Sequence, residues 1–250
     1  MFRPMFRPAL AVFIRSARAI ALLAFGAAAM GAHAAPASQC YGGVSKGRLA
    51  GGVRLPVAGP NFSAYSAEAI AAGRTHVHAT VARIMAHAYA GALVPLPSAR
   101  FVYGETGMAN GGPFAPHKTH QNGLSVDFFV PVRDARGAAA LPASAQNRYG
   151  YDIEFDADGR YQGYRIDFAA YAEHLYQLDL AARAHGAALA LVIVDPRYMP
   201  ALLSSARGPW LRKHIPFMRA RPWVRHDEHY HVDFKLACAP LHAAPAGGRR

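Results

Sequence analysis

The chain has 250 residues, of which 52% are hydrophobic, and a formal net charge of +12. This length suits one domain with or without a leader, and the apolar fraction is sufficient for a sizeable core. The longest apolar run near the N-terminus, residues 19–30, is short for a membrane span of about 20 residues, and the positive charge favours a partner with an anionic surface.

The first 34 residues predict a secretory signal peptide. Arg3, Arg7, Arg15 and Arg18 precede the apolar run, and the small residues around His33 in the sequence Ala-His-Ala form a cleavage site. Removal of the four arginines lowers the net charge from +12 to +8. We therefore expect a periplasmic protein without a stable membrane anchor. Nucleic acid is not expected as its partner, and an anionic cell-wall polymer or membrane surface fits the charge better.

The chain contains two cysteines, Cys40 and Cys238. An even pair in an oxidising compartment predicts one disulfide, which would join the start of the mature chain to a segment near its end.

Periodicity and turn-forming residues predict the elements of the first part of the mature chain. Residues 41–63 are rich in Gly and Pro and predict an irregular arm. Residues 75–89 place apolar side chains at the spacing of an amphipathic helix, with Thr75 as its N-cap. Strands are predicted over residues 99–105 and 123–132.

The second part of the chain continues this mixture of strands and helices. The predicted elements are a hairpin over 151–166 that turns at Asp158-Gly159, a helix over 166–185, a buried strand over 188–196, a short helix over 209–215 and a last strand within 225–236. This pattern favours a single α+β domain, residues 35–242, with a central and mainly antiparallel sheet flanked by helices. Residues 243–250 are predicted to be a disordered tail.

The last predicted strand, "RHDEHYHVDFKL", contains three histidines in six residues. In a strand, His229, His231 and Asp233 would share one face, and Tyr230 with its apolar neighbours would pack on the other. A metal site is one interpretation, because neutral imidazole is a common zinc ligand. A solvent-facing histidine cluster is the other, in a chain with 13 histidines.

A second cluster, "PHKTHQNGLSVDFF", contains a carboxylate within an apolar strand. A carboxylate at such a position is costly unless it is paired or bound to a metal ion. His120 and Asp127 would supply two ligands and His231 a third, which leaves one position open for water, as in catalytic zinc sites. His229 would lie on the same strand face as His231 and could manage protons or stabilise an oxyanion.

These two motifs, "HKTHQNGLSVDFF" and "HDEHYHV", resemble those of the penicillin-insensitive murein endopeptidases, which are grouped with D-Ala-D-Ala peptidases, lysostaphin-type peptidases and the hedgehog signalling domain. The resemblance extends from about Cys40 to Cys238. It implies a sheet-borne Zn²⁺ site with His120, Asp127 and His231 as ligands and His229 as the catalytic histidine. It also implies that His117 and His226 line the site, and that the substrate is a D-Ala-containing peptide cross-link of peptidoglycan.

Two positions depart from the family pattern. Asp233 stands where the family usually has Arg, and Ser125 replaces an acid. Two other functions remain open at this stage. One is a zinc D,D-carboxypeptidase or dipeptidase acting on small substrates, which a closed pocket would favour over a groove. The other is a non-catalytic protein that binds zinc or the cell wall, against which the additional histidine beside the ligands argues.

Overall fold

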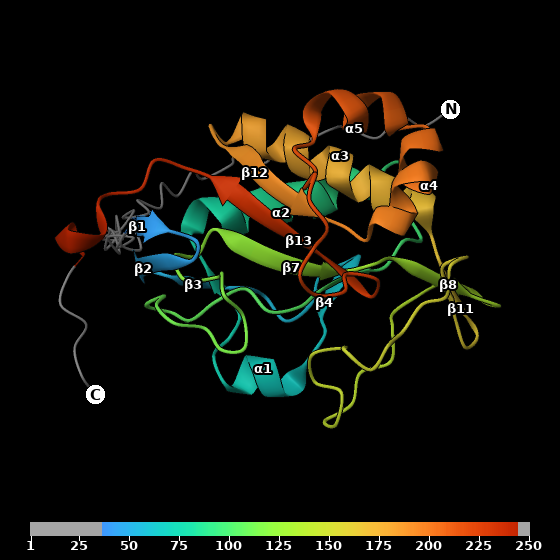
Figure 1. Cartoon of the computed structure of the whole chain (residues 1–250), viewed down its shortest axis with the longest axis horizontal. Helices are drawn as coiled ribbons and strands as arrows, with labels where there is room; N and C mark the ends of the chain where they lie inside the picture. Colours follow the sequence, from blue (N-terminus) through green and yellow to red (C-terminus); the bar gives the residue numbers. More distant parts are fainter. Residues whose placement is uncertain (1–36, 245–250) are drawn as a thin grey trace, which may run out of the picture. The chain divides into compact units, whose positions relative to one another are not determined.

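A five-stranded sheet forms the centre of the structure, a computed structural model that describes residues 37–244 (Figure 1). The strand order is β12 (Ala188–Ile193), β13 (His229–Lys235), β7 (Ser125–Phe129), β6 (Phe101–Tyr103) and β4 (Phe62–Ala64). All neighbouring strands are antiparallel except β4 and β6. The predicted α+β class with a mainly antiparallel central sheet is confirmed.

Two long helices, α2 (Ala79–Leu93) and α3 (Phe168–Ala184), cover one face of this sheet (Figure 1). Tyr230 of β13 packs against Tyr171 of α3, with ring centroids 4.4 Å apart. Val232 and Phe234 alternate with the polar residues of β13 and are buried in the same core. The prediction that the last strand has one apolar and one polar face is therefore confirmed. Its polar face is the one that does not pack on this core.

The predicted N-cap of the first long helix is wrong. Thr75 lies before the short strand β5 (His76–Val77), and α2 begins only at Ala79. His78 is the N-cap instead, because its Nδ1 accepts a hydrogen bond from the Thr80 backbone N–H at 3.1 Å. Histidine is an uncommon cap, so local sequence preference favoured the threonine.

The predicted irregular arm over residues 41–63 is also wrong. It contains a hairpin of β1 (Gln39–Gly43) and β2 (Lys46–Ala50), followed by β3 (Val53–Arg54), which pairs with β5, and by β4. The short helix α1 (Ala67–Ala71) follows. Gly42 and Gly51 have positive φ angles, so the glycines turn the chain between short strands.

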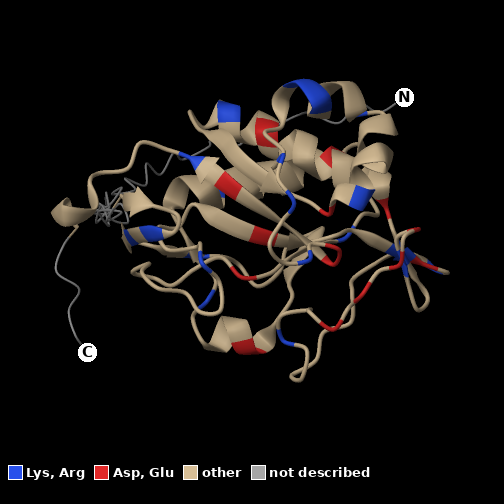
Figure 2. Cartoon of the chain, viewed as in Figure 1, with Lys and Arg blue, Asp and Glu red and all other residues tan. Residues whose placement is uncertain are grey.

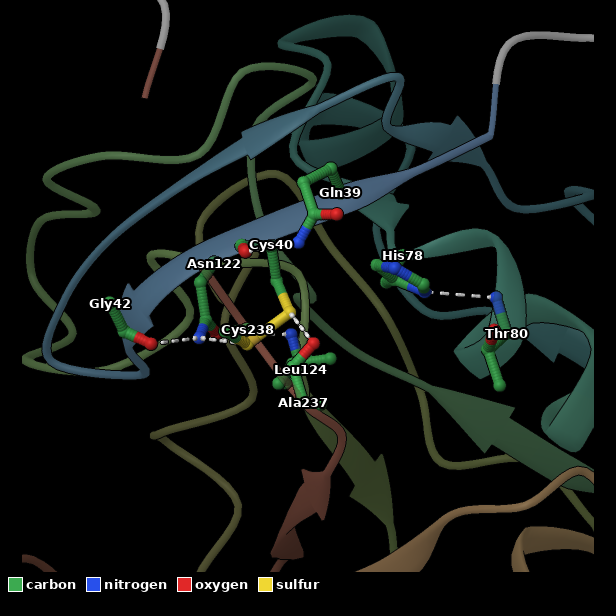
Figure 3. The surroundings of a disulfide bond; sticks show 9 residues. All are labelled: Gln39, Cys40, Gly42, His78, Thr80, Asn122, Leu124, Ala237 and Cys238. Carbon is green, nitrogen blue, oxygen red and sulfur yellow. Dashed lines mark hydrogen bonds between the residues drawn. A yellow bond between two sulfur atoms is a disulfide. The ribbon is translucent and has the colours of Figure 1, made fainter. Parts of the chain in front are cut away.

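The predicted disulfide is confirmed: Cys40 of β1 is bonded to Cys238, 198 residues further along the chain (Figure 3). Backbone hydrogen bonds reinforce this connection, since the Ala239 N–H donates to the Cys40 carbonyl and the Gly42 N–H donates to the Ala239 carbonyl. The bond anchors the N-terminal hairpin beside the segment that follows β13.

A second, four-stranded sheet has the order β10 (Arg160–Tyr161), β11 (Tyr164–Ile166), β8 (Val132–Asp134) and β9 (Gly137–Ala139). The predicted hairpin exists, but it turns at Gln162-Gly163 and not at Asp158-Gly159. Gln162 adopts a positive φ of 52° in this turn. The Asp-Gly pair forms an earlier turn in which Asp156 accepts backbone hydrogen bonds.

The C-terminal part contains a 3-10 turn η1 (Pro196–Tyr198), helices α4 (Met199–Ser204) and α5 (Gly208–His214), and a last turn η2 (Leu241–Ala243). The predicted signal peptide, residues 1–34, lies outside the described residues, as do residues 245–250 of the predicted tail. Within residues 37–244, every helix is too short or too polar to cross a membrane.

Candidate active site

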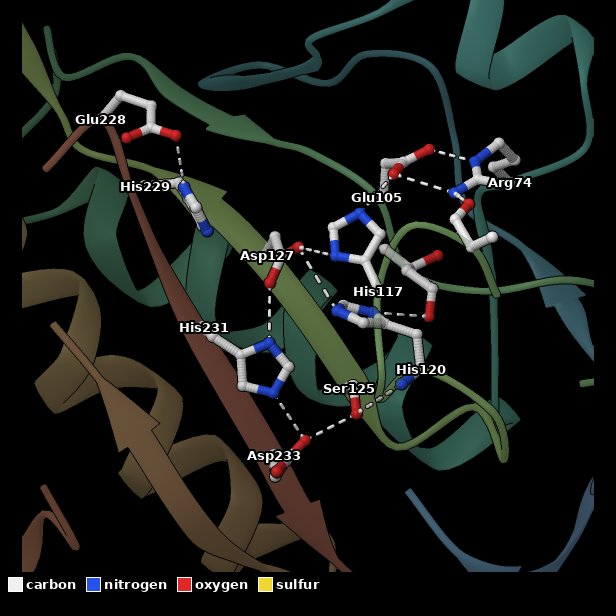
Figure 4. Close-up of polar contacts among 12 residues, drawn as sticks. Arg74, Glu105, His117, His120, Ser125, Asp127, Glu228, His229, His231 and Asp233 are labelled. Atoms are coloured by element: carbon white, nitrogen blue, oxygen red, sulfur yellow. Dashed lines mark hydrogen bonds and ion pairs between the residues drawn. The ribbon is translucent and has the colours of Figure 1, made fainter. Parts of the chain in front are cut away.

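The polar face of the central sheet is built by the pairing of β7 with β13. Antiparallel pairing places Asp127 directly opposite His231, and Ser125 opposite Asp233. Directly opposed residues project from the same face, so these side chains meet. His231 Nδ1 lies 2.8 Å from Asp127 Oδ1 (Figure 4). Acidic positions in both central strands are visible in Figure 2.

His120 reaches this face from the loop before β7. It is fully buried, and its φ of 67° is in the left-handed region that non-glycine residues rarely adopt. Its Nδ1 lies 3.2 Å from the Thr106 carbonyl, which can only accept, so Nδ1 carries the proton. Burial lowers the pKa of His120, which favours the neutral ring.

The lone pair of His120 therefore lies on Nε2. This atom is buried, makes no hydrogen bond, and lies 3.3 Å from Asp127 Oδ2. Two electron-rich atoms face each other without a proton between them when the ring is neutral. A cation bound to both would remove this conflict, which makes the arrangement suitable for a metal ion.

His117 lies beside the same carboxylate and is part of a longer polar chain. Its Nε2 is 2.6 Å from Glu105 Oε2, its Nδ1 is 3.7 Å from Asp127 Oδ2, and Glu105 is held in turn by Arg74. One potential ligand atom from each of His117, His120 and Asp127 lies within 4.8 Å of the others, so this cluster could hold a metal ion.

His231 is held from its other side by Asp233. The Nε2 atom of His231 lies 2.8 Å from Asp233 Oδ1, and Ser125 Oγ donates to the same oxygen at 2.6 Å. A carboxylate that accepts from one imidazole nitrogen leaves the other nitrogen available as a ligand. The two departures from the family pattern, Ser125 and Asp233, therefore contact each other and hold His231.

His229 and His226 lie beside this group. His229 Nδ1 is 2.8 Å from Glu228 Oε1. Burial opposes protonation of His229, but the charge and hydrogen bond of Glu228 outweigh it and raise the pKa of His229. His226 belongs to the loop that precedes β13, because this strand begins at His229. Its ring centroid lies 4.8 Å from that of His229.

The site holds more buried carboxylates than ordinary packing explains. Asp127, Glu105, Glu228 and Asp233 are all at most 6% exposed. Burial alone would raise the pKa of Asp127, but the neighbouring imidazoles of His120 and His231 hold it well below its usual value. A buried cluster of ionised carboxylates requires compensating positive charge, and the imidazole nitrogens and carboxylate oxygens around Asp127 are ligands that zinc accepts.

Asp127, Glu228 and Asp233 line one cleft of about 560 Å³ together with the histidines beside them. Tyr151, Trp223 and Val224 form apolar parts of its wall and are 44%, 57% and 53% exposed, although large apolar residues are usually covered. The loop from Trp223 to His226 also borders a second hollow of about 1200 Å³, which contains several arginines. The cleft thus adjoins further recessed surface.

The structure brings together all six predicted site residues: His117, Asp127, His226, His229 and His231 line the cleft, and His120 lies buried beneath it. The sequence reasoning missed Arg74, Glu105 and Glu228. Glu228 directly precedes a predicted catalytic histidine, and that proximity was the available signal. Arg74 and Glu105 had no local signal that distinguished them from surface charges.

The fold and the site define an α+β protein with a buried cluster of histidines and carboxylates that could hold a metal ion. Residues 40–244 match the family described as penicillin-insensitive murein endopeptidase. The chain therefore belongs to this family, as the two histidine motifs predicted. Comparison with curated proteins found no significant match. The family membership supports hydrolysis of murein, with peptidoglycan as the substrate, and action in the periplasm.

Proposed function

We propose that the protein is an exported zinc metallopeptidase that hydrolyses D-Ala-containing peptide cross-links of peptidoglycan. In this proposal His120, Asp127 and His231 bind the metal ion. The observation that carries it is the opposed position of Asp127 and His231 on β7 and β13, with the unpaired Nε2 of His120 beside the same carboxylate.

His231 is preferred to His117 as the third ligand because its ring nitrogen lies closer to Asp127. Asp233 holds His231 through Nε2 and leaves Nδ1 directed at Asp127. His117 instead makes its short contact with Glu105 and lies 3.7 Å from Asp127. We therefore assign His117 to the wall of the cleft, where it can contact the substrate.

A zinc ion held by these residues would lower the pKa of a bound water molecule to about 7 and polarise the scissile carbonyl. The protein supplies the proton handling. His229 uses Nδ1 for Glu228, so Nε2 is the atom that remains for the cleft. From there it can donate a hydrogen bond to the developing oxyanion, or a proton to the leaving amine as the C–N bond breaks.

His226 supports this arrangement from the neighbouring loop. Burial and the nearby charge of His229 lower the pKa of His226 to about 4. His226 is therefore neutral at periplasmic pH, and its Nδ1 donates to the Val224 carbonyl at 3.0 Å. We assign it to positioning His229 and the loop that carries Trp223.

The open cleft favours a cross-linked polymer over a small dipeptide. Exposed apolar side chains on the wall and the adjoining hollow offer contacts on more than one side of the reacting bond. A zinc D,D-carboxypeptidase would require only the pocket beside the ligands. A purely structural metal site would require a fourth protein ligand. Asp127 and His231 instead border an open cleft, so water or substrate can take the fourth position.

The direct test is mass analysis of muropeptides after incubation with the purified mature protein. We expect cross-linked dimers to be converted to monomers, with insensitivity to penicillin and inhibition by a chelator. Release of free D-Ala from monomers without loss of dimers would establish the carboxypeptidase. Unchanged muropeptides with zinc-loaded protein would refute both enzymatic assignments.

A further inference from the structure

The four-stranded sheet presents three arginines in direct cross-strand register. Arg160 of β10 lies opposite Arg165 of β11, and Arg165 lies opposite Arg133 of β8. Directly opposed residues project from the same face, so the three side chains form one row, which we call the arginine row. All three line a surface hollow of about 580 Å³, together with Arg136 from the β8–β9 turn.

Like charges in directly opposed positions destabilise a sheet. Nearby acids compensate the arginine row only in part. Asp167 pairs with Arg133 at 3.3 Å, and Asp134 pairs with Arg136 at 3.1 Å. Within residues 37–244, Arg160 and Arg165 form no ion pair. Asp156, four residues before Arg160, accepts hydrogen bonds from backbone N–H groups instead. The hollow therefore retains positive charge that the fold does not use.

The arginine row lies near the candidate active site along the chain. Arg133 follows Asp127 by six residues, because β8 continues almost directly from β7. Six residues span at most about 22 Å between Cα atoms even when fully extended. A polymeric substrate that occupies the cleft is therefore long enough to reach this sheet as well.

We propose that the arginine row binds carboxylates of peptidoglycan outside the cleaved cross-link, and so docks the enzyme on the intact polymer. This proposal rests on peptidoglycan being the substrate. Its peptide stems carry repeated free carboxylates, and arginine binds such groups with paired N–H donors. Each surface contact is weak, but a second attachment to one polymer raises the effective concentration of substrate at the cleft.

The test compares Arg160→Gln/Arg165→Gln with a matched control, Lys46→Gln/Lys213→Gln, which removes two exposed charges elsewhere. Binding to intact insoluble peptidoglycan is measured on ice at low salt by co-sedimentation. We expect about tenfold weaker binding for the arginine variant, little change for the control, and loss of the difference at high salt. Turnover of soluble cross-linked dimers should be unchanged, and the unfolding temperature should be equal to or above that of the wild type.

Equal binding by the arginine variant and the wild type would overturn the proposal, as would equal losses in both variants. A loss of binding to anionic lipid vesicles with normal polymer binding would also overturn it and indicate a membrane surface instead. If no muropeptide is cleaved by any form, the proposed reaction fails, but the binding comparison still decides whether the arginine row docks the polymer.

Discussion

His231 and Asp127 occupy directly opposed positions on β13 and β7, and Nδ1 of the histidine lies 2.8 Å from Oδ1 of the carboxylate. The pair joins two motifs that are separated by about a hundred residues in the sequence. Because both strands are held by the core on their other face, the two side chains are pre-positioned. The other proposed ligand, His120, and the proposed proton-handling histidine, His229, are arranged around this pair.

The two possible ligand sets can be separated by substitution. We expect about one zinc ion per wild-type chain, loss of the ion in His231→Ala, and retention in His117→Ala, because a ring nitrogen of His231 lies 2.8 Å from Asp127 whereas that of His117 lies 3.7 Å away. Metal content is measured after dialysis, with the exposed His87→Ala as a control. Full occupancy in His231→Ala together with loss in His117→Ala would establish the other set.

Replacement of His229 should separate chemistry from metal binding. We expect His229→Ala to retain zinc and cross-linked substrate binding but to lose turnover by about 10²–10⁴-fold, because the proton donor beside the cleft is removed. Single-turnover kinetics on a purified dimer and metal analysis of the same sample give both readouts. A nearly normal rate in the zinc-loaded variant would exclude this role and make His226 the next candidate.

Asp233 should tune metal affinity through His231. Asp233→Ala removes the acceptor at 2.8 Å from His231 Nε2 and should weaken zinc binding by about 10–100-fold. Asp233→Asn keeps an acceptor oxygen and should recover part of that loss. Competition with a coloured chelator measures both affinities. An unchanged affinity in Asp233→Ala would show that the contact does not position the ligand.

The disulfide should contribute strongly to stability. Free-thiol titration of unfolded, unreduced protein should find none. Paired Cys40→Ser and Cys238→Ser substitutions should lower the free energy of unfolding by about 2–5 kcal/mol, because the bond closes a loop of nearly the whole domain. Denaturant unfolding measures the change. Two titratable thiols in the wild type would contradict the bond.

Buried His174 should make the core sensitive to acid. It lies in α3 against Tyr230, and burial lowers its pKa from 6.5 to about 3. Between those values the unfolded state binds a proton that the folded state does not, so stability falls as the pH decreases through this window. The free energy of unfolding should therefore fall by about 1.4 kcal/mol per pH unit because of this group.

The matched variant is His174→Gln, which cannot titrate but still offers an acceptor to the Tyr230 hydroxyl. Its free energy of unfolding should depend less steeply on pH than that of the wild type between about pH 6 and pH 4. Parallel pH profiles for the two proteins would show that His174 is not the responsible group.

The sequence by itself determined the features that depend on local pattern or on composition. Alternation along residues 229–235 separated a polar face from Tyr230, Val232 and Phe234, because a strand has a period of two. The two cysteines had only each other as partners. The histidine motifs, in their order, were sufficient to indicate the family, since few structures need those residue types at those spacings.

Only the tertiary structure decided which of the distant residues meet. The chain Arg74–Glu105–His117, the entry of His226 into the cleft and the register of Arg165 with Arg133 all depend on pairings between segments far apart in sequence. The turn at Gln162-Gly163 followed the same rule, because strand pairing overrode the local preference for Asp158-Gly159. Strand register is set by packing of the whole core, and no short stretch of the sequence contains that information.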